Sequence, residues 1–303
     1  MKLAPLPQSE FISGVSEGIF DLDFDAYKND SGINASALKK IIRSMKFWHA
    51  SKLQPKEQTE DMLIGTLVHL GVLEPHRFGD GKSHYFKPTT YKDAKTGEDK
   101  KWNGNAKVCQ EWLENHADLP AISSQIGERV YSMKKAILDD EMAAEFLTNG
   151  HREVSLFCAD PVTGERRKAR LDVLCRGEDA VYIGDIKKME DVDDEIAVNR
   201  TFTKWRYYLQ FRFYYDLLDD LLSSDGTPPP VIRALAGCIE DSIAPELVWW
   251  EMDEDGMIEG SKQWRKAIDR YHFSKINGTV PGYDKALKIR KLHLNAWRFK
   301  NEE

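Results

Sequence analysis

The chain has 303 residues, of which 41% are hydrophobic, 31% charged and 11% aromatic, and its formal net charge is −7. This length allows one large domain with a substantial core, and the composition is far from that of a disordered protein. The acidic balance argues against a generally basic coat protein for nucleic acid. It still allows a nucleic-acid enzyme, because one local basic groove is enough to bind phosphates.

Segments that direct a protein to membranes or to secretion are not expected. No apolar run is long enough to cross a bilayer, and the first residues lack the apolar stretch of a secretory signal. The four cysteines are far apart and show no CxxC spacing, which argues against a disulfide scaffold and against a zinc ribbon. We therefore expect a cytoplasmic protein with no membrane partner.

The N-terminal region differs in charge from the rest of the chain. We expect an N-terminal arm and a basic helix within residues 1–58, packed on a main domain at 59–303. Residues 1–30 look irregular, whereas residues 31–56 contain six basic side chains and no acidic one, with Ser36 as a possible helix cap. The basic helix is either a solvated surface or a contact to the phosphate backbone beside the aromatic pair Phe47–Trp48.

Helices are expected in the middle of the chain and strands after residue 152. Apolar spacing predicts helices at residues 61–73, 103–116 and 124–147, and a polar segment at 79–101 is expected to be a mobile loop. Three runs rich in β-branched residues, separated by turn sequences, predict an antiparallel meander at 153–158, 168–175 and 180–187. The remaining expected elements are a helix, two strands and a helix, at 203–222, 231–240, 246–251 and 260–276. The order predicts an α/β fold with a central mixed β-sheet flanked by helices.

Charged residues with catalytic potential lie on two of the expected strands. Asp185 and Lys187 are two residues apart, so they share a face; alone they could form an ordinary surface ion pair. Asp172 interrupts the apolar run of the preceding strand. Two carboxylates on one face repel unless a cation lies between them, and Mg²⁺ or Mn²⁺ prefers such oxygen ligands. Lys187 beside such a metal would be suited to phosphodiester hydrolysis.

These residues resemble the signature of PD-(D/E)XK nucleases, in the variant without the proline: Asp172, then Asp185-Ile186-Lys187. The segment Gly65-Thr66-Leu67-Val68-His69, followed by Leu73-Glu74-Pro75, resembles the helix of RecE-type and RecB-type nucleases whose histidine is a metal ligand. The resemblance covers about residues 31–220 and is strongest to the RecE-type phage exonuclease domain. It implies a PD-(D/E)XK nuclease core.

The resemblance also assigns roles to individual residues. The implied metal ligands are His69, Asp172, Asp185 and the carbonyl of Ile186. The implied catalytic groups are Lys187, Asp172, Asp185 and an auxiliary acid, Glu153. Gln210 and Tyr214, spaced as the Gln-x-x-x-Tyr motif of this branch, would position the substrate or an ordered water.

The assignments of residues other than Asp172 and Asp185 have simpler alternatives. His69 could be a hydrogen-bonded core residue, and Glu153 could form a strand-end ion pair with Arg152. A basic edge beside Asp172 is better suited to a phosphate track than to a core, and we expect it to bind substrate. That edge consists of Arg166, Arg167, Lys168 and Arg170.

The sequence therefore predicts a Mg²⁺-dependent deoxyribonuclease, with Mn²⁺ able to substitute, and the RecE-type resemblance implies an exonuclease that acts on the ends of double-stranded DNA. Cleavage from 5′ to 3′, the production of 3′ single strands for homologous recombination, a ring-shaped homo-oligomer and a single-strand-annealing partner are implied by the RecE-type resemblance. The alternatives are a RecB-like nuclease, an endonuclease of the same fold, or a catalytically inactive DNA-binding module. A basic stretch at 285–300 could be a second phosphate contact or a solvated face.

Overall fold

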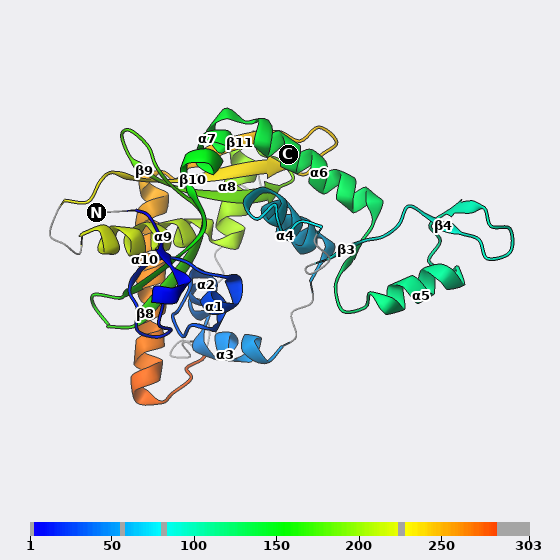
Figure 1. The fold of residues 1–303 in the computed structure, drawn as a ribbon. Helices are drawn as coiled ribbons and strands as arrows, with labels where there is room; N and C mark the ends of the chain where they lie inside the picture. The colour runs from blue at the N-terminus through cyan, green and yellow to red at the C-terminus, as the bar shows by residue number, and fades with distance from the viewer. Residues whose placement is uncertain (1–2, 55–57, 80–83, 224–227, 284–303) are drawn as a thin grey trace, which may run out of the picture.

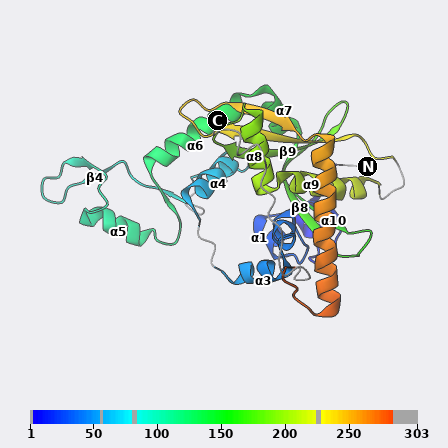
Figure 2. The same cartoon turned by 180° about the vertical axis from the view of Figure 1, so that it is seen from behind.

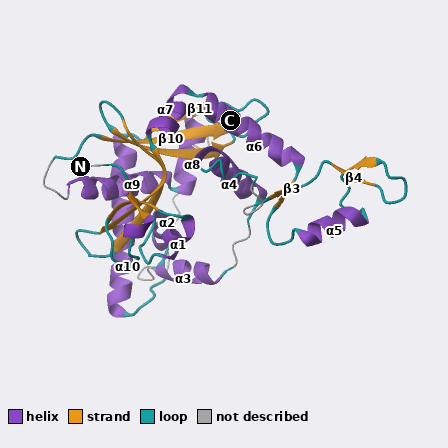
Figure 3. Ribbon diagram, in the orientation of Figure 1, coloured by secondary structure: helices purple, strands orange, loops and turns teal. Residues whose placement is uncertain are grey.

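The computed structural model describes residues 3–54, 58–79, 84–223 and 228–283 (Figure 1). The basic stretch at 285–300 lies outside the described residues. A seven-stranded mixed sheet forms the centre of the molecule, as predicted, with helices on both of its faces (Figures 2 and 3). Its strands in spatial order are β1 (Leu6–Pro7), β2 (Gly18–Asp21), β7 (His151–Ala159), β8 (Arg166–Arg176), β9 (Val181–Met189), β10 (Ile232–Glu240) and β11 (Leu247–Glu251).

The middle of the sheet is the antiparallel meander that the turn sequences predict. Strand β7 pairs with β8 and β8 with β9, both antiparallel. Strand β10 then pairs parallel with β9, after a crossover through two helices, and β11 pairs antiparallel with β10. The sheet is therefore mixed because one crossover connection follows three strands joined by tight turns.

Two apolar cores lie on opposite faces of this sheet. One contains residues of α2, α9 and α10, such as Leu38, Leu209 and Trp264. The other contains residues of α4, α6 and α7, such as Ile64, Met133 and Phe146. The described helices are α1 (Phe24–Asn29), α2 (Ala35–Ile41), α3 (Met45–Leu53), α4 (Glu60–Leu73), α5 (Lys107–Asn115), α6 (Ser124–Asp139), α7 (Glu141–Asn149), α8 (Glu195–Trp205), α9 (Tyr207–Ser223) and α10 (Glu254–Asn277).

The first 30 residues are more ordered than the sequence suggested. Strand β2 pairs antiparallel with β7 and so extends the central sheet. Ile19, Phe20 and Leu22 are buried, and Phe20 packs against Phe157 of β7. The expectation of an irregular arm is therefore corrected, because this short apolar run contributes to the core and to the sheet.

Several helices are shorter than predicted because capping side chains interrupt them. The expected basic helix is two helices, α2 and α3, whose N-caps are Asn34 and Ser44 rather than Ser36. Asp140 caps α7 and separates it from α6. Arg206, with φ of 53°, separates α8 from α9. The side chains of Asn34, Ser44 and Asp140 each accept a hydrogen bond from a backbone amide at the start of a helix, which a continuous helix would have bonded internally.

The segment expected to be a loop is partly a β-structured extension that projects from the body of the molecule (Figure 1). It contains β3 (Tyr85–Phe86), β4 (Thr90–Lys92), β5 (Asp99–Lys101), α5 and β6 (Ala121–Ile122). Trp112 stacks on His116 and makes an edge contact with Trp102. These aromatic contacts give the extension a small core that polar composition alone did not indicate.

All four cysteines are buried free thiols. In the part of the chain that the structure describes, no helix has both the length and the apolar character needed to cross a bilayer.

Candidate metal centre and active site

The site forms where two central strands separate. The antiparallel ladder between β8 and β9 ends at the pair Val173–Gly184, and the next pair in the same register would be Asp172 and Asp185. Instead, the backbone amide of Ile186 donates a hydrogen bond to Oδ2 of Asp172, at 2.7 Å. The strands therefore part at the two aspartates and leave polar groups of both strands available to a common site.

The side-chain alternation of β8 also changes at this point. Leu171 and Leu174 both pack in the core that contains α9, whereas Val173 packs in the opposite core beside α4. A regular strand would place Leu171 and Val173 on the same face. Asp172 thus lies at a local irregularity, between the α4 side and the α9 side of the sheet.

His69 approaches Asp172 from α4, the helix that begins at the capping residue Thr59. Its Nδ1 lies 3.4 Å from Oδ2 of Asp172, and its Nε2 lies 2.8 Å from the carbonyl oxygen of Ile186. The imidazole is partly exposed. The structure therefore brings together three of the four groups that the resemblance assigned to a metal.

Glu153 completes a compact group with these residues. One ligand atom from each of His69, Glu153 and Asp172 lies within 4.8 Å of the others. Glu153 has a φ of 53°, a left-handed conformation that is rare for residues other than glycine and that often marks functional sites. Burial and the neighbouring Asp172 raise the pKa of Glu153, while the adjacent guanidinium of Arg170 lowers it.

The partner of Glu153 is not the one that the sequence suggested. Its carboxylate forms an ion pair with Arg170, which also donates to the carbonyl oxygen of Leu22, at 2.8 Å. The alternative of an ion pair between Glu153 and its neighbour Arg152 is not observed. Arg170 consequently connects the acidic group to the N-terminal segment.

Asp185 and Lys187 form a second group beside the first. Oδ2 of Asp185 forms an ion pair with Lys187, and Oδ1 accepts a hydrogen bond from Nε2 of Gln210, at 3.0 Å. Burial lowers the pKa of Lys187. Asp185 is not a member of the three-residue group with His69, so its role as a metal ligand stays a prediction.

The Gln-x-x-x-Tyr motif on α9 lies next to this second group. Gln210 accepts a hydrogen bond from Nζ of Lys39, at 2.7 Å, as well as donating to Asp185. Burial raises the pKa of Tyr214 well above its ordinary value. Lys39 comes from α2, and burial lowers its pKa to about 7. The sequence placed Lys39 only within a basic stretch; its approach to Gln210 depends on the packing of α2 on α9.

The basic edge does not form an exposed phosphate track, and we correct that expectation. Arg166 pairs with the buried carboxylate of Asp30. Lys168 is buried, and its Nζ donates to three carbonyl oxygens of the N-terminal segment, those of Tyr27, Lys28 and Asp30.

The other members of that edge are also engaged within the protein. Arg167 is fully buried and pairs with Asp220 at 2.6 Å. Arg170 pairs with Glu153, as described above. The basic side chains of β8 thus bind groups within the protein, because both faces of the strand are covered: the N-terminal segment lies over Arg166 and Lys168, and α9 lies over Arg167.

The donor set suits a hard divalent cation. Three of the four candidate ligands, Glu153, Asp172 and the Ile186 carbonyl, would supply oxygens, which Mg²⁺ and Mn²⁺ prefer, and His69 would add one nitrogen. Ligands about 2.1 Å from an octahedral Mg²⁺ lie about 3 Å from one another. Each ring nitrogen of His69 has one neighbour near that spacing, the Ile186 carbonyl oxygen 2.8 Å from Nε2 and Oδ2 of Asp172 3.4 Å from Nδ1. Only one ring nitrogen can bind the cation, so one of these two oxygens would share it with His69. The residues present therefore fit the metal that the sequence predicts.

Solved structures support the same fold. One similar structure, from Eubacterium rectale and described as a "putative exonuclease", has a TM-score of 0.57 and 12% sequence identity; the match covers 94% of this chain and 100% of that chain. A second, SSO0001, has a TM-score of only 0.27 and 13% identity over 69% of this chain and 88% of its own, which supports no argument. No curated protein matches the chain.

Family membership follows from the sequence over most of its length. Residues 34–288 match the model of a family described as a PDDEXK-like domain of unknown function (DUF3799). That range contains His69, Glu153, Asp172, Asp185 and Lys187. Together with the mixed sheet and the geometry of the site, this match supports a nuclease. The chain belongs to the PDDEXK-like family DUF3799.

Proposed function

We propose that the protein is a Mg²⁺-dependent deoxyribonuclease that degrades double-stranded DNA from its ends. The observation that carries this proposal is the group formed by His69, Glu153 and Asp172, with the Ile186 carbonyl 2.8 Å from His69 and the Asp185–Lys187 pair beside it. A bound divalent cation would supply Lewis-acid activation of a water and of the scissile phosphate. The cation would be held by His69, Glu153, Asp172 and the Ile186 carbonyl, with Asp185 as a further proposed ligand.

The remaining groups would act directly on the substrate or its proton transfers. Lys187 lies next to the acidic group and has a lowered pKa, so its ammonium can stabilise charge on a phosphoryl oxygen and exchange a proton with water. Gln210 fixes Asp185 through a hydrogen bond and keeps its carboxylate oriented. Burial and the neighbouring Asp172 disfavour the negative charge of Glu153, and its ion pair with Arg170 offsets this only in part, so a bound cation would favour the ionised carboxylate.

The finer features of the proposal derive from the RecE-type motifs. Those motifs, His69 on α4 and Gln210 with Tyr214 on α9, support cleavage from 5′ to 3′, a 3′ single-stranded product for recombination, a ring-shaped homo-oligomer and a single-strand-annealing partner. Mn²⁺ should replace Mg²⁺, since both ions prefer carboxylate, carbonyl and water oxygens.

The test compares linear plasmid with covalently closed circular plasmid in one tube, with Mg²⁺ present. An exonuclease requires an end, so the linear DNA should be degraded while the circle survives. Equal loss of both substrates would indicate an endonuclease of the same fold, and loss of neither would favour a DNA-binding module without activity. Labelling the 5′ or the 3′ end of the linear DNA then determines the polarity.

A further inference from the structure

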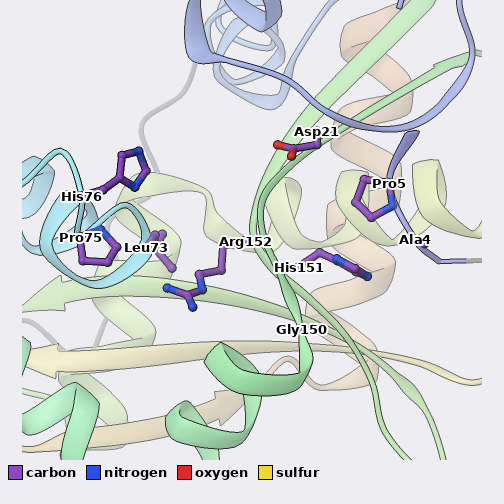
Figure 4. Close-up of a pocket in the computed structure, with 9 residues that line it drawn as sticks. All are labelled: Ala4, Pro5, Asp21, Leu73, Pro75, His76, Gly150, His151 and Arg152. Carbon is purple, nitrogen blue, oxygen red and sulfur yellow. The ribbon is translucent and has the colours of Figure 1, made fainter. Parts of the chain in front are cut away.

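A polar groove leads away from the metal centre between segments that are far apart in the sequence. Phe24 of α1, His76 after α4 and Arg152 of β7 line it, and its inner end reaches Glu153 and Arg170. Its volume is about 620 Å³. An adjoining hollow of about 550 Å³ shares His76 and Arg152 with it (Figure 4). We call these two spaces together the N-terminal groove.

Arg152 is the cation best placed to contact a ligand in this groove. It is exposed, and its guanidinium has no ion pair within the described ranges, in contrast to Arg170. Figure 4 shows it extending from β7 toward the end of α4, where Leu73 and Pro75 lie. Adjacent side chains of a regular strand point to opposite faces. The left-handed conformation of Glu153 interrupts this alternation, and both Arg152 and Glu153 line the groove.

Phe24 contributes an apolar surface to the same groove. Its side chain is 50% exposed although it is aromatic, and the guanidinium of Arg170 lies 6.0 Å from the centre of its ring. An exposed ring beside cationic side chains is the usual combination for binding single strands, because bases stack on the ring while cations contact the backbone. Phe24 precedes the range that the family model matches, so this wall of the groove is contributed by the chain's own N-terminal segment.

We propose that the N-terminal groove binds a single strand of nucleic acid next to the metal centre, with Arg152 contacting a backbone phosphate and Phe24 stacking on a base. This inference rests on the proposed nuclease function and specifies the form of its substrate at the site. Each of its two spaces is within the size of ordinary ligand pockets, about 300–1,000 Å³, and neither is an extended surface for a duplex.

Charge in the groove favours a single strand over a duplex. Carboxylates alternate with cations along its lining, so there is no continuous cationic face for the two backbones of a duplex; besides Asp23, the charged residues are Asp21, Asp25, Glu74, Arg77, Arg152, Glu153 and Arg170. Asp23 is already engaged, because it caps α1 and accepts a hydrogen bond from Gln8. A single strand needs only a few phosphate contacts and gains additional free energy from stacking.

The test measures binding without cleavage. Fluorescence anisotropy in EDTA would follow a labelled oligothymidine of 12 nucleotides, and a blunt duplex of the same length, added to the full chain. Phe24→Ala should raise the Kd for the single strand at least about fivefold, the lower end of the effect of one stacked base. Arg152→Ala should weaken binding and lower the slope of log K against log salt by about 0.7, the value for one phosphate of a single strand.

Matched controls are available on other surfaces. Arg176→Ala removes an exposed arginine from the far end of β8, and Phe273→Ala removes an exposed aromatic from α10. Both variants should bind as the wild type does. Because Arg152 and Phe24 are exposed, their variants should retain the wild-type melting temperature.

The outcomes separate this inference from the proposed function. If the wild type cleaves DNA but Arg152→Ala and Phe24→Ala bind the single strand normally, the groove proposal is overturned and the nuclease proposal stands. If the wild type binds the strand through these two residues but never cleaves DNA with Mg²⁺ or Mn²⁺, the nuclease proposal fails and the groove remains a binding site. A wild type that binds the duplex more tightly than the single strand also overturns the inference.

Discussion

The amide of Ile186 donates a hydrogen bond to Oδ2 of Asp172, at 2.7 Å, at the point where β8 and β9 stop pairing as strands. A side-chain carboxylate thus replaces a backbone carbonyl as the acceptor. The carbonyl oxygen of the same Ile186 lies 2.8 Å from His69. Because β8 and β9 stop pairing at this point, polar groups of both strands lie beside His69 of α4 and can act as ligands.

Metal binding should stabilise the protein measurably. A ligand that binds only the folded state at about 100 times its Kd adds about 2.7 kcal/mol to the free energy of unfolding. We expect Mn²⁺ to raise the melting temperature of the wild type and to have little effect on His69→Ala, which removes the imidazole that lies beside both Asp172 and the Ile186 carbonyl. Differential scanning fluorimetry measures the shift, with His116→Ala on the projecting extension as the control. An undiminished shift in His69→Ala would mean that the cation binds at another place.

Lys187→Ala should separate chemistry from metal binding. The ammonium is not a ligand, so the variant should bind Mn²⁺ with near wild-type affinity, whereas turnover should fall by about 100-fold or more. Calorimetric titration gives the affinity and single-turnover cleavage gives the rate. Lys204→Ala, an exposed lysine of α8, is the control. A loss of metal affinity with nearly unchanged turnover would show that Lys187 is structural.

The raised pKa of Glu153 predicts how the stability of the metal-free protein depends on pH. The folded state retains the proton of Glu153 to a higher pH than the unfolded state, in which the pKa is about 4.3. The unfolded state therefore binds fewer protons in the window above about pH 4.3, and stability falls as the pH rises through it. Glu153→Gln removes this contribution.

From pH 4 to pH 7, the free energy of unfolding of Glu153→Gln should therefore rise relative to that of the wild type. Urea denaturation in EDTA at several pH values measures it, and Glu178→Gln on the turn after β8 serves as the control. A difference that is constant with pH would contradict the raised pKa.

Arg167 should matter for stability rather than for DNA binding. Its guanidinium is fully buried and pairs with Asp220. Breaking a fully buried pair typically costs about 3–5 kcal/mol; Asp220→Ala should cost less, because the Asp220 side chain is 34% exposed and Arg167 keeps its hydrogen bond to the Ala159 carbonyl. Arg167→Met keeps much of the volume and should cost less. Urea denaturation measures both, and an Arg167→Met variant with wild-type stability but weakened DNA binding would restore the phosphate-track interpretation.

The residues that the sequence placed in one site, and that the structure brings together, are visible in short-range patterns. The Asp185–Lys187 spacing, the acid at position 172 within an apolar run, and His69 on a helix are each visible within a few residues, and the structure places all of them at one edge of the split between β8 and β9. The mixed sheet was predictable for the same reason, since its turns and apolar runs are local.

The residues that were misinterpreted depend on contacts distant in the sequence. The direction of Lys168 is decided by carbonyl groups near residue 30, and that of Arg167 by Asp220 on α9. Neither partner could be identified from a basic run alone. Arg152 became a candidate phosphate contact only because the left-handed conformation of the adjacent Glu153 places both side chains in the N-terminal groove. No sequence pattern indicates that conformation.

The most direct test of metal-dependent nuclease activity uses an end-labelled linear duplex and two proteins, the wild type and Asp172→Asn. The substitution keeps the shape of the side chain and removes the charge that the cation needs, while Asp179→Asn, on the exposed turn before β9, is the matched control. We predict progressive shortening of the duplex by the wild type and by Asp179→Asn with Mg²⁺, none in EDTA, and at least about a 100-fold slower reaction with Asp172→Asn. Cleavage by Asp172→Asn at the wild-type rate, or equal cleavage in EDTA, would contradict the account.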